Sequence, residues 1–554
     1  MTHDEPGSFN LVDQPWLIAR TVDGDRVDLS LAEVFRRAHE LTGLLGDVPT
    51  QVFALTRLLL AVLHQAVEGP RDKQHWAQLW EDEDENFATE ALKYLERHRH
   101  RFDLLNPEAP FLQVAGLRTK KGEVSELNKL IADIPNGHPF FTTRLGDRVS
   151  LSFAEAARWV VHCHAYDPSG IKSGAVDDDR VRNGKGYPIG TGWAGYLGGV
   201  LPEGATLRET LLLNLIPDES ETMPRSHTID LPVWERDPLG PAESDLLHRP
   251  TGPVDLYTWQ SRRLRLVREG DKVTGVLICN GDRITPQNRN RVEPHTGWRR
   301  SKAQEKKLGE SRVYMPREHE PQKAVWRGLQ SMLPGAVASQ DRDAAPFLAP
   351  RVLEWIAEAE DFLDADLLVR VRTIGMTYGA QSATTTDIVD DALSLRVALL
   401  RRQDTRLADM AVRCVQVAEK AAQALGKLAE NLAAASGAGQ DEREGPRSRA
   451  IELAYAELDQ PFRTWLRGIG PDTDVRGAET DWHLTANRIV RDLGSELLRQ
   501  APMKAWSGRV VKGQLVTSAH ADRWFRRALR LALRYAYPDT GDGDSDTGED
   551  KVAS

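Results

Sequence analysis

The last third of the chain repeats apolar residues at the spacing of a long α-helix. Between residues 407 and 428 they recur every three or four positions and so share one helical face: Leu407, Met410, Ala411, Cys414, Val417, Ala418, Ala421, Leu425 and Leu428. Further amphipathic stretches follow at 448–466, 480–500 and 517–537. With a first helix over 397–435, these stretches predict a C-terminal four-helix bundle spanning 396–538, because short or polar links join them.

The residues before the bundle, 1–395, follow no single period. They begin with a predicted hairpin that turns near Asp23-Gly24, then a helix capped by Ser30 and Glu33, then a strongly apolar helix over 50–67. Strand-like runs at 254–259, 264–267 and 273–279 alternate with Gly- and Pro-rich loops. We therefore expect an α+β protein with a large irregular N-terminal domain that carries long functional loops.

Charge and composition limit where such a protein works. A net charge of -10 argues against a surface coated with nucleic acid, although a local basic patch can still bind it. Part of the acidity lies in the tail, 539–554, whose Asp, Gly, Ser and Thr residues predict disorder. Three distant cysteines, no long apolar run and an acidic N-terminus favour a cytoplasmic protein without a signal sequence or membrane contact.

Two clusters have residue types that bind metal ions. His162-Cys163-His164 has no second Cys or His pair at zinc spacing, and alternate residues on a helix point apart, so we expect no zinc site. Asp177-Asp178-Asp179 is the only dense acidic cluster that a metal-dependent nuclease could use, but its polar loop favours solvated acids. No Walker A lysine motif is present. We expect no cofactor and no catalysis, with a metal-dependent nuclease as the alternative.

Three segments have the composition of a nucleic-acid contact. The loop Pro168–Gly174 carries two glycines, two hydroxyls and Lys172, so its backbone can approach a ligand closely. The segment 282–312 holds nine cations against four acids, and the turn 376–386 carries a lone Gln381. Each segment is also compatible with an ordinary surface loop. The same holds for the arginines on one face of the last helix: Arg523, Arg526, Arg527, Arg530 and Arg534.

Four short blocks resemble a known family in their order and spacing. They are Phe9–Leu17, Ala109–Gln113, Leu207–Asn214 and Leu231–Trp234. The family is CasA, the large subunit of the type I-E CRISPR surveillance complex, Cascade. The resemblance covers roughly the first 390 residues, and the expected bundle fits the family's C-terminal domain. It implies a non-catalytic subunit that recognises the PAM of duplex target DNA largely from the minor groove, promotes strand separation and R-loop formation, and recruits the helicase-nuclease.

The resemblance also implies which residues contact DNA. The family's glycine loop matches Pro168–Gly174, with Ser169 and Gly170 at the tip and Lys172 after them. The family's glutamine wedge, which inserts into the duplex beside the PAM, matches the turn with Gln381. The family's PAM-contacting lysine falls within 280–291, where this chain has no lysine. The candidates to replace it are Asn280, Arg283 and Arg289.

A further loop of the family contacts the 5′ handle of the guide RNA and the neighbouring Cascade subunits. It resembles residues 139–146, with Phe140 or Phe141 as the stacking aromatic and Thr143 close by. The expected partners are thus duplex target DNA, guide RNA, other Cascade subunits and the helicase-nuclease effector. Besides the nuclease, a second alternative is a pure assembly scaffold whose bundle holds other subunits together.

Overall fold

The computed structural model describes residues 7–82, 84–134, 149–223, 229–334, 346–511 and 513–537. The chain divides into two compact units, residues 1–405 and 406–554. This division falls after Thr405, whereas the sequence analysis set the domain boundary after residue 395. The tail at 539–554 and the expected guide-RNA loop at 139–146 lie outside the described residues.

A three-stranded antiparallel sheet opens the first unit. Its strands are β1 (Leu17–Thr21), β2 (Arg26–Leu29) and β3 (Leu41–Leu45), in the order β2-β1-β3. The turn of the predicted hairpin contains Gly24 at φ 94°, a conformation that glycine adopts without strain. Ser30 and Glu33 form a reciprocal capping box at the start of α1 (Leu31–Arg36). Both predictions for this segment are confirmed.

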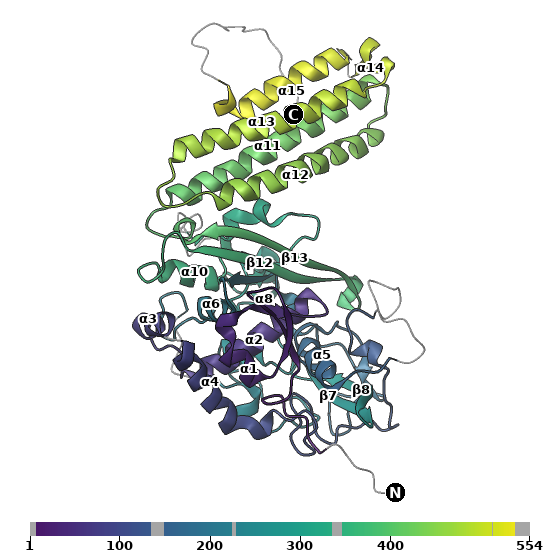
Figure 1. The fold of residues 1–554 in the computed structure, drawn as a ribbon. Helices are drawn as coiled ribbons and strands as arrows, with labels where there is room; N and C mark the ends of the chain where they lie inside the picture. Colours follow the sequence, from purple (N-terminus) through teal and green to yellow (C-terminus); the bar gives the residue numbers. More distant parts are fainter. Residues whose placement is uncertain are drawn as a thin grey trace. The chain divides into compact units, whose positions relative to one another are not determined.

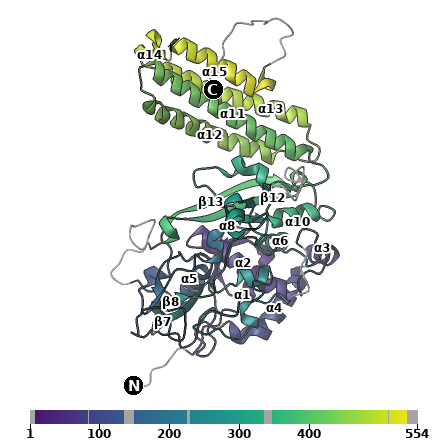
Figure 2. The ribbon, with the colours of Figure 1, turned by 180° about the vertical axis from the view of Figure 1, so that it is seen from behind.

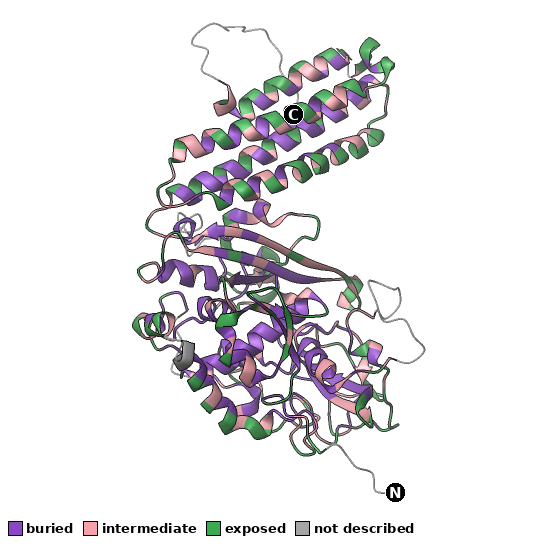
Figure 3. Cartoon of the chain, in the orientation of Figure 1, coloured by how far each residue is buried: buried purple, intermediate pink, exposed green. Residues whose placement is uncertain are grey.

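The helix α2 (Pro49–Ala66) forms the centre of the first unit. Its residues from Thr50 to His64 are all buried, as Figure 3 shows, because neighbouring segments cover every face of this apolar sequence. This confirms the prediction of a buried helix over 50–67. Figure 1 shows α2 between α4 (Asp84–His98) and α5 (Phe153–Tyr166). The helix that follows α2 in the chain is α3 (Lys73–Glu81).

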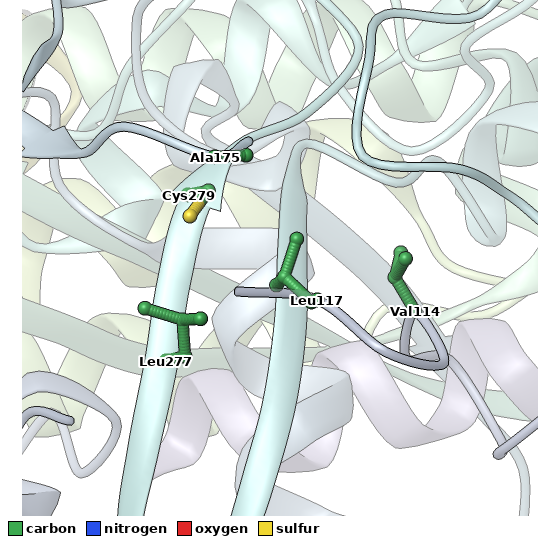
Figure 4. Packing of buried hydrophobic residues seen from close by; sticks show 5 residues of the cluster. All are labelled: Val114, Leu117, Ala175, Leu277 and Cys279. Atoms are coloured by element: carbon green, nitrogen blue, oxygen red, sulfur yellow. The ribbon is translucent and has the colours of Figure 1, made fainter. Parts of the chain in front are cut away.

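A four-stranded sheet of order β5-β4-β8-β7 holds the predicted glycine loop. Its β7 (Arg262–Glu269) and β8 (Lys272–Asn280) form the predicted hairpin, with Gly270 at φ 61° in the turn. The short β4 (Lys172–Ser173) pairs in parallel with the end of β8, and β5 (Lys185–Gly186) is an edge strand. Figure 4 shows the buried cluster beside this sheet: Val114, Leu117, Ala175, Leu277 and Cys279.

A long hairpin crosses the first unit. β12 (Leu368–Tyr378) pairs with β13 (Thr385–Arg396) along its full length, and β6 (Gly199–Glu203) adds a third strand. The hairpin tip lies on the same side of the unit as α5 in both views (Figures 1 and 2). The remaining elements include α6 (Leu207–Leu213), α8 (Lys302–Leu308), α10 (Arg351–Glu358) and a sheet of β10 (Tyr314–Pro316), β9 (Trp298–Arg300) and β11 (Phe347–Leu348).

One strand expected from the sequence is wrong. The run 254–259 begins with the short helix α7 (Pro253–Tyr257). The carboxylate of Asp230 accepts hydrogen bonds from the backbone N–H groups of Val254 (2.9 Å) and Asp255 (3.0 Å), two donors in the first turn that lack intrahelical partners. Pro253 also favours a helix start. The stabilising carboxylate lies more than twenty residues away, so the local pattern could not reveal it.

A buried ion pair joins α2 to the chain before β9. Arg57 donates from both terminal nitrogens to the two carboxylate oxygens of Glu293, at 2.8 Å each, and both side chains are at most 3% exposed. Glu293 also accepts from the indole N–H of Trp193 (2.6 Å) and the backbone N–H of His295 (2.9 Å). The carboxylate is therefore satisfied on both oxygens, which is the condition under which a buried charge is tolerated.

The second unit is a helical bundle with the four long helices that the periodicity predicts. They are α11 (Arg406–Ala435), α12 (Glu444–Arg467), α13 (Val475–Arg499) and α15 (Ser518–Ala532), which lie side by side in Figures 1 and 2. The start of the first helix at residue 397 is wrong. Val397–Leu399 forms a separate buried 3₁₀ turn that directly follows β13, and α11 begins only at Arg406.

An insertion separates the last two bundle helices. It consists of α14 (Met503–Ser507) and the hairpin of β14 (Arg509–Val511) and β15 (Gln514–Val516). Taken together, the small sheets of the first unit and the helices of the second confirm the expected α+β class. Among the described residues, every helix is too short or too polar to span a bilayer.

Candidate nucleic-acid interface

The predicted glycine loop connects α5 to β4. The helix begins at a capping box between Ser152 and Glu155 and ends at Tyr166, with Asp167 as its C-cap, so the loop starts at a defined point. Ser169 is buried, whereas the following Ile171 is exposed. Gly170 has φ 147°, which L side chains rarely adopt, and a Cβ placed on it would have no neighbour within 4 Å. The loop therefore presents its backbone to open space at Gly170.

The base of the loop is fixed by two cations that share one carboxylate. Lys172 Nζ lies 2.6 Å and Arg262 Nε 2.5 Å from Oδ2 of the buried Asp167. Burial alone would raise the pKa of Asp167, but Lys172 and Arg262 outweigh it and hold that pKa below its ordinary value. Lys172 thus has an intramolecular partner and is only 17% exposed. A contact with DNA would have to share its ammonium with Asp167, and the predicted contact stays a prediction.

Arg262 also binds backbone carbonyls on both sides of the loop. Its Nη2 donates to the carbonyls of Asp167 (3.2 Å), Pro168 (3.1 Å) and Gly190 (2.8 Å). These three bonds occupy backbone carbonyl oxygens and involve no backbone N–H group of the loop. In the described part of the chain, the backbone N–H groups of Ser169 and Gly170 have no hydrogen-bond partner. The loop therefore offers two unused donors, which suit an acceptor such as a phosphate or groove oxygen.

The turn that carries Gln381 closes the β12–β13 hairpin. Backbone bonds from Gly379 N–H to the Thr384 carbonyl (2.8 Å) and from Ser382 N–H to the Gly379 carbonyl (2.9 Å) define it. Gln381 and Ser382 both have left-handed φ angles, 56° and 53°. Non-glycine residues adopt this conformation at a cost of about 1–2 kcal/mol each. The strained turn leaves the Gln381 side chain exposed.

The glycine loop and the hairpin turn face one cavity. It has a volume of about 620 Å³ and is lined by the C-terminal end of α5, residues 168–173 of the loop, the hairpin residues Ala383–Thr386, Ile278 of β8 and much of the segment 125–134. The Tyr378 hydroxyl donates to the Tyr166 carbonyl at 2.7 Å, which ties the hairpin to the last residue of α5. Two segments more than 200 residues apart in sequence are thus brought together.

The three candidates for the missing lysine lie in different surroundings. Asn280 ends β8 beside the loop, because Ser173 pairs with Cys279, but it is buried and donates to the Tyr187 carbonyl at 2.6 Å. Its Oδ1 is buried without a hydrogen-bond partner in the described residues. Arg283 is exposed. Arg289 is half-buried, which lowers its pKa, and donates to the Thr285 carbonyl at 3.2 Å. Neither arginine is among the described residues lining the cavity.

The expected guide-RNA contacts cannot be placed in this structure. Phe140, Phe141 and Thr143 lie outside the described residues, six or more positions after Ile134 in the sequence. Their role stays a prediction.

The two metal-type clusters have other partners. The imidazole of His162 bonds to the Thr50 hydroxyl and that of His164 to the Leu112 carbonyl, both at 2.9 Å. Burial lowers the pKa of His162 to about 3 and that of His164 to about 4, so both rings are neutral near pH 7. No group of three or more His, Cys, Asp or Glu side chains in the described ranges is arranged to hold a metal ion.

The acidic cluster is divided by its own neighbours. Asp178 forms a two-pronged pair with Arg180, whose Nε and Nη2 each lie 3.0 Å from a carboxylate oxygen. Asp177 lies 3.7 Å from Arg118. Asp179 is exposed and accepts from Arg182 through its backbone carbonyl. The carboxylates of Asp177 and Asp178 therefore contact different arginines, whereas Asp179 makes its contact through the backbone.

The sequence analysis missed the two residues that anchor the loop, Asp167 and Arg262. The sequence signal was weak, because Arg262 and Arg263 begin a strand in which three of the next six residues are apolar. In the structure both arginines are only 1% exposed. Arg263 is paired with Asp282 at 2.6 Å. Buried arginines require partners, but the partners lie elsewhere in the chain, so the sequence alone could not name them.

Fold and site together define a two-unit α+β protein with a loop-and-hairpin cavity suited to binding. A family model described as CRISPR-associated protein Cse1 matches residues 10–493. The crystal structure of Cse1 from Thermobifida fusca is 47% identical, with a TM-score of 0.89 over 97% of this chain and all of that one. Cse1 from Acidimicrobium ferrooxidans is 34% identical, with a TM-score of 0.81 over 97% of this chain and all of that one.

A curated relative supports the same family assignment. The CRISPR-associated protein CasA/Cse1 of Thermus thermophilus is 29% identical over 516 residues, which are 90% of this chain and 91% of the relative. The chain belongs to the Cse1 family of CRISPR-associated proteins. The resemblance to CasA is confirmed.

Proposed function

We propose that this chain is the large, non-catalytic subunit of a type I-E Cascade complex and recognises the PAM in duplex target DNA. In this role it works with the other Cascade subunits, starts strand separation for R-loop formation and recruits the helicase-nuclease. Family membership supports the assignment to CRISPR defence. The observation that carries the DNA-reading role is the cavity that the glycine loop shares with Ala383–Thr386, the hairpin residues next to Gln381.

The glycine loop has the chemistry of a minor-groove reader. The minor groove offers mainly acceptors, at A N3 and T O2, so a protein reads it with donors. The unpartnered N–H groups of Ser169 and Gly170 are such donors. Gly170 lacks a side chain where close approach is needed, and Arg262 already occupies the neighbouring Pro168 carbonyl. Asn280, Arg283 and Arg289 remain candidates for further DNA contacts.

The hairpin turn has the geometry of a wedge. An exposed glutamine at the end of a rigid two-stranded hairpin can insert between base pairs, where unstacking costs a few kcal/mol per step. Once a few bases are open, pairing with the guide RNA nearly balances the lost duplex. The wedge therefore acts on the first step, and the guide completes the rest. We propose that Phe140, Phe141 and Thr143 contact the guide RNA handle.

Replacing Gly170 by aspartate is expected to weaken PAM-dependent binding. The new carboxylate would face phosphate, and we expect a loss on the order of tenfold, or about 1.4 kcal/mol. The measurement is the dissociation constant of the assembled complex for a PAM-containing duplex, at low and high salt. The weakening should shrink at high salt because screening reduces the repulsion.

The matched control for this variant is Gly170→Asn. It has nearly the same size and the same positive-φ strain but carries no charge, so it isolates the electrostatic part of the effect. Complex assembly should be unchanged in both variants. Equal binding by wild type and Gly170→Asp would remove the loop from the DNA contact.

The nuclease alternative makes an opposite prediction. We expect the purified protein to leave linear and circular DNA intact in the presence of Mg²⁺ or Mn²⁺, because Asp178 is held by Arg180 and Asp177 lies beside Arg118. Gel electrophoresis of the DNA after incubation checks this. Cutting that persists through repurification and disappears in the exposed-site variant Asp179→Asn would establish the nuclease instead.

A further inference from the structure

The last bundle helix carries a stripe of arginines that lies opposite its packed face. Ala521, Phe525 and Leu529 are buried at intervals of four residues. Three exposed arginines recur at intervals of three or four on the other side of α15, and the exposed Arg534 follows in the 3₁₀ turn after the helix. We call these four residues the arginine stripe: Arg523, Arg527, Arg530 and Arg534. The helix thus separates an apolar inner face from a cationic outer face.

The stripe has few anions of its own. The only acid on α15 is Asp522, and it pairs with Arg526 (2.9 Å), which lies outside the stripe. Across the described chain, Arg523 and Arg527 form no hydrogen bond or ion pair. Like charges four residues apart on a helix repel, and α15 carries one such pair within the stripe, Arg523/Arg527, while Arg534 adds a cation in the 3₁₀ turn that follows the helix. An external anion would relieve this repulsion.

The chain leaves the bundle at the end of this stripe. The Tyr537 hydroxyl donates to Asn487 of α13 at 2.8 Å, which fixes the last described residue. The Arg530 guanidinium lies 5.4 Å from the Tyr537 ring, and that of Arg534 lies 4.7 Å from the Tyr535 ring. Whatever follows Tyr537 therefore starts beside two of the four stripe arginines.

The segment that follows is acidic. Residues 539–554 contain one lysine and six acids: Asp539, Asp542, Asp544, Asp546, Glu549 and Asp550. Sixteen residues can extend over about 50 Å, whereas the fifteen residues of α15 span only about 22 Å. The segment is therefore long enough to run back along the whole stripe, and its charge is complementary.

We propose that the acidic tail, residues 539–554, docks on the arginine stripe of α15. Each ion pair on an exposed helix is weak, but a tethered segment has an effective concentration in the millimolar range, so weak affinity suffices. The tail then occupies this cationic face until a stronger polyanion displaces it.

A free tail peptide tests the proposal. The probe is a fluorescein-labelled peptide of residues 539–554, and the two receptors are the wild-type chain and a full-length chain whose six tail acids are replaced by amides. The peptide should bind the amide-tailed chain about three- to tenfold more tightly, because the tethered tail no longer competes. Fluorescence anisotropy measures both affinities, and added salt should weaken both.

Two double variants of the amide-tailed chain locate the binding surface. Arg523→Gln with Arg527→Gln should abolish most of the peptide affinity. Arg449→Gln with Arg467→Gln removes the same charge from exposed positions on α12 and should leave the affinity largely intact. Thermal unfolding checks that all chains are folded. Equal peptide affinity for the wild-type and amide-tailed chains, or an equal loss in the two double variants, would overturn the proposal.

Discussion

Replacing Gln381 by alanine is expected to slow R-loop formation on a linear PAM-containing duplex by about ten- to a hundredfold. The exposed amide would no longer fill the gap between separated base pairs, so the cost of unstacking the first step would fall on the DNA contacts alone. In a target already mismatched beside the PAM, or in a negatively supercoiled one, unstacking the first step requires less additional free energy. The defect should therefore be much smaller on those two substrates. Stopped-flow fluorescence of a base analogue beside the PAM measures the rate.

Ser382→Ala is the matched control for this experiment. Ser382 occupies the same turn with nearly the same left-handed backbone, at φ 53°, so the substitution keeps the local strain and leaves Gln381 in place. Its opening rate should stay close to that of the wild type. Both variants should assemble into the complex normally. A pure scaffold predicts no difference between them, and an unchanged rate for Gln381→Ala on intact linear DNA would disprove the wedge.

Replacing Glu293 by glutamine is expected to destabilise the first unit by about 3–5 kcal/mol. The amide preserves the shape of the side chain but leaves the Arg57 guanidinium buried without a counter-charge. Urea unfolding at pH 7, followed by tryptophan fluorescence, measures the loss. Glu90→Gln breaks an exposed pair with Lys93 and should change stability little. A Glu293→Gln chain as stable as wild type would show that the buried pair contributes nothing.

The same pair gives a pH dependence with a defined sign. Burial alone would raise the pKa of Glu293, but Arg57 and His295 outweigh it and hold that pKa well below the ordinary value of 4.5. A carboxyl with a depressed folded-state pKa contributes stability that is present above its unfolded pKa and lost as the pH falls toward the folded value. The stability gap between wild type and Glu293→Gln should therefore narrow below about pH 4.5. Urea titrations at pH 7 and pH 4 test this.

Local patterns predicted the elements whose stabilising contacts are local. The capping box of Ser30 and Glu33, the turn at Gly270 and the bundle helices all depend on residues close in sequence, and all are found. The strand expected at 254–259 failed because a distant carboxylate, Asp230, caps a helical turn there. The start of α11 failed because Val397–Leu399, although apolar, packs as a separate turn after β13.

In the candidate site, too, the local features could be predicted and the contacts between distant segments could not. The composition of the loop and the lone glutamine marked two segments, but only the fold could bring residues 168–173 and 383–386 to one cavity. Lys172 illustrates the limit of composition most clearly. A lysine in a glycine loop suggests a phosphate contact, whereas the structure pairs its ammonium with Asp167, next to Arg262. A charge pattern shows that a cation is present and leaves its partner undetermined.

The hydrogen bond from the Tyr378 hydroxyl to the Tyr166 carbonyl constrains the distance between the hairpin and the glycine loop. It ties the end of β12 next to the Gln381 turn to the last residue of α5, the helix from which the glycine loop departs, so protein geometry sets the gap between the loop and the turn. The number of base pairs between the recognised letters and the first melted step would then be invariant. Tyr378→Phe would remove this bond and, under the proposed function, would make the position where melting begins less defined while the recognised PAM stays the same.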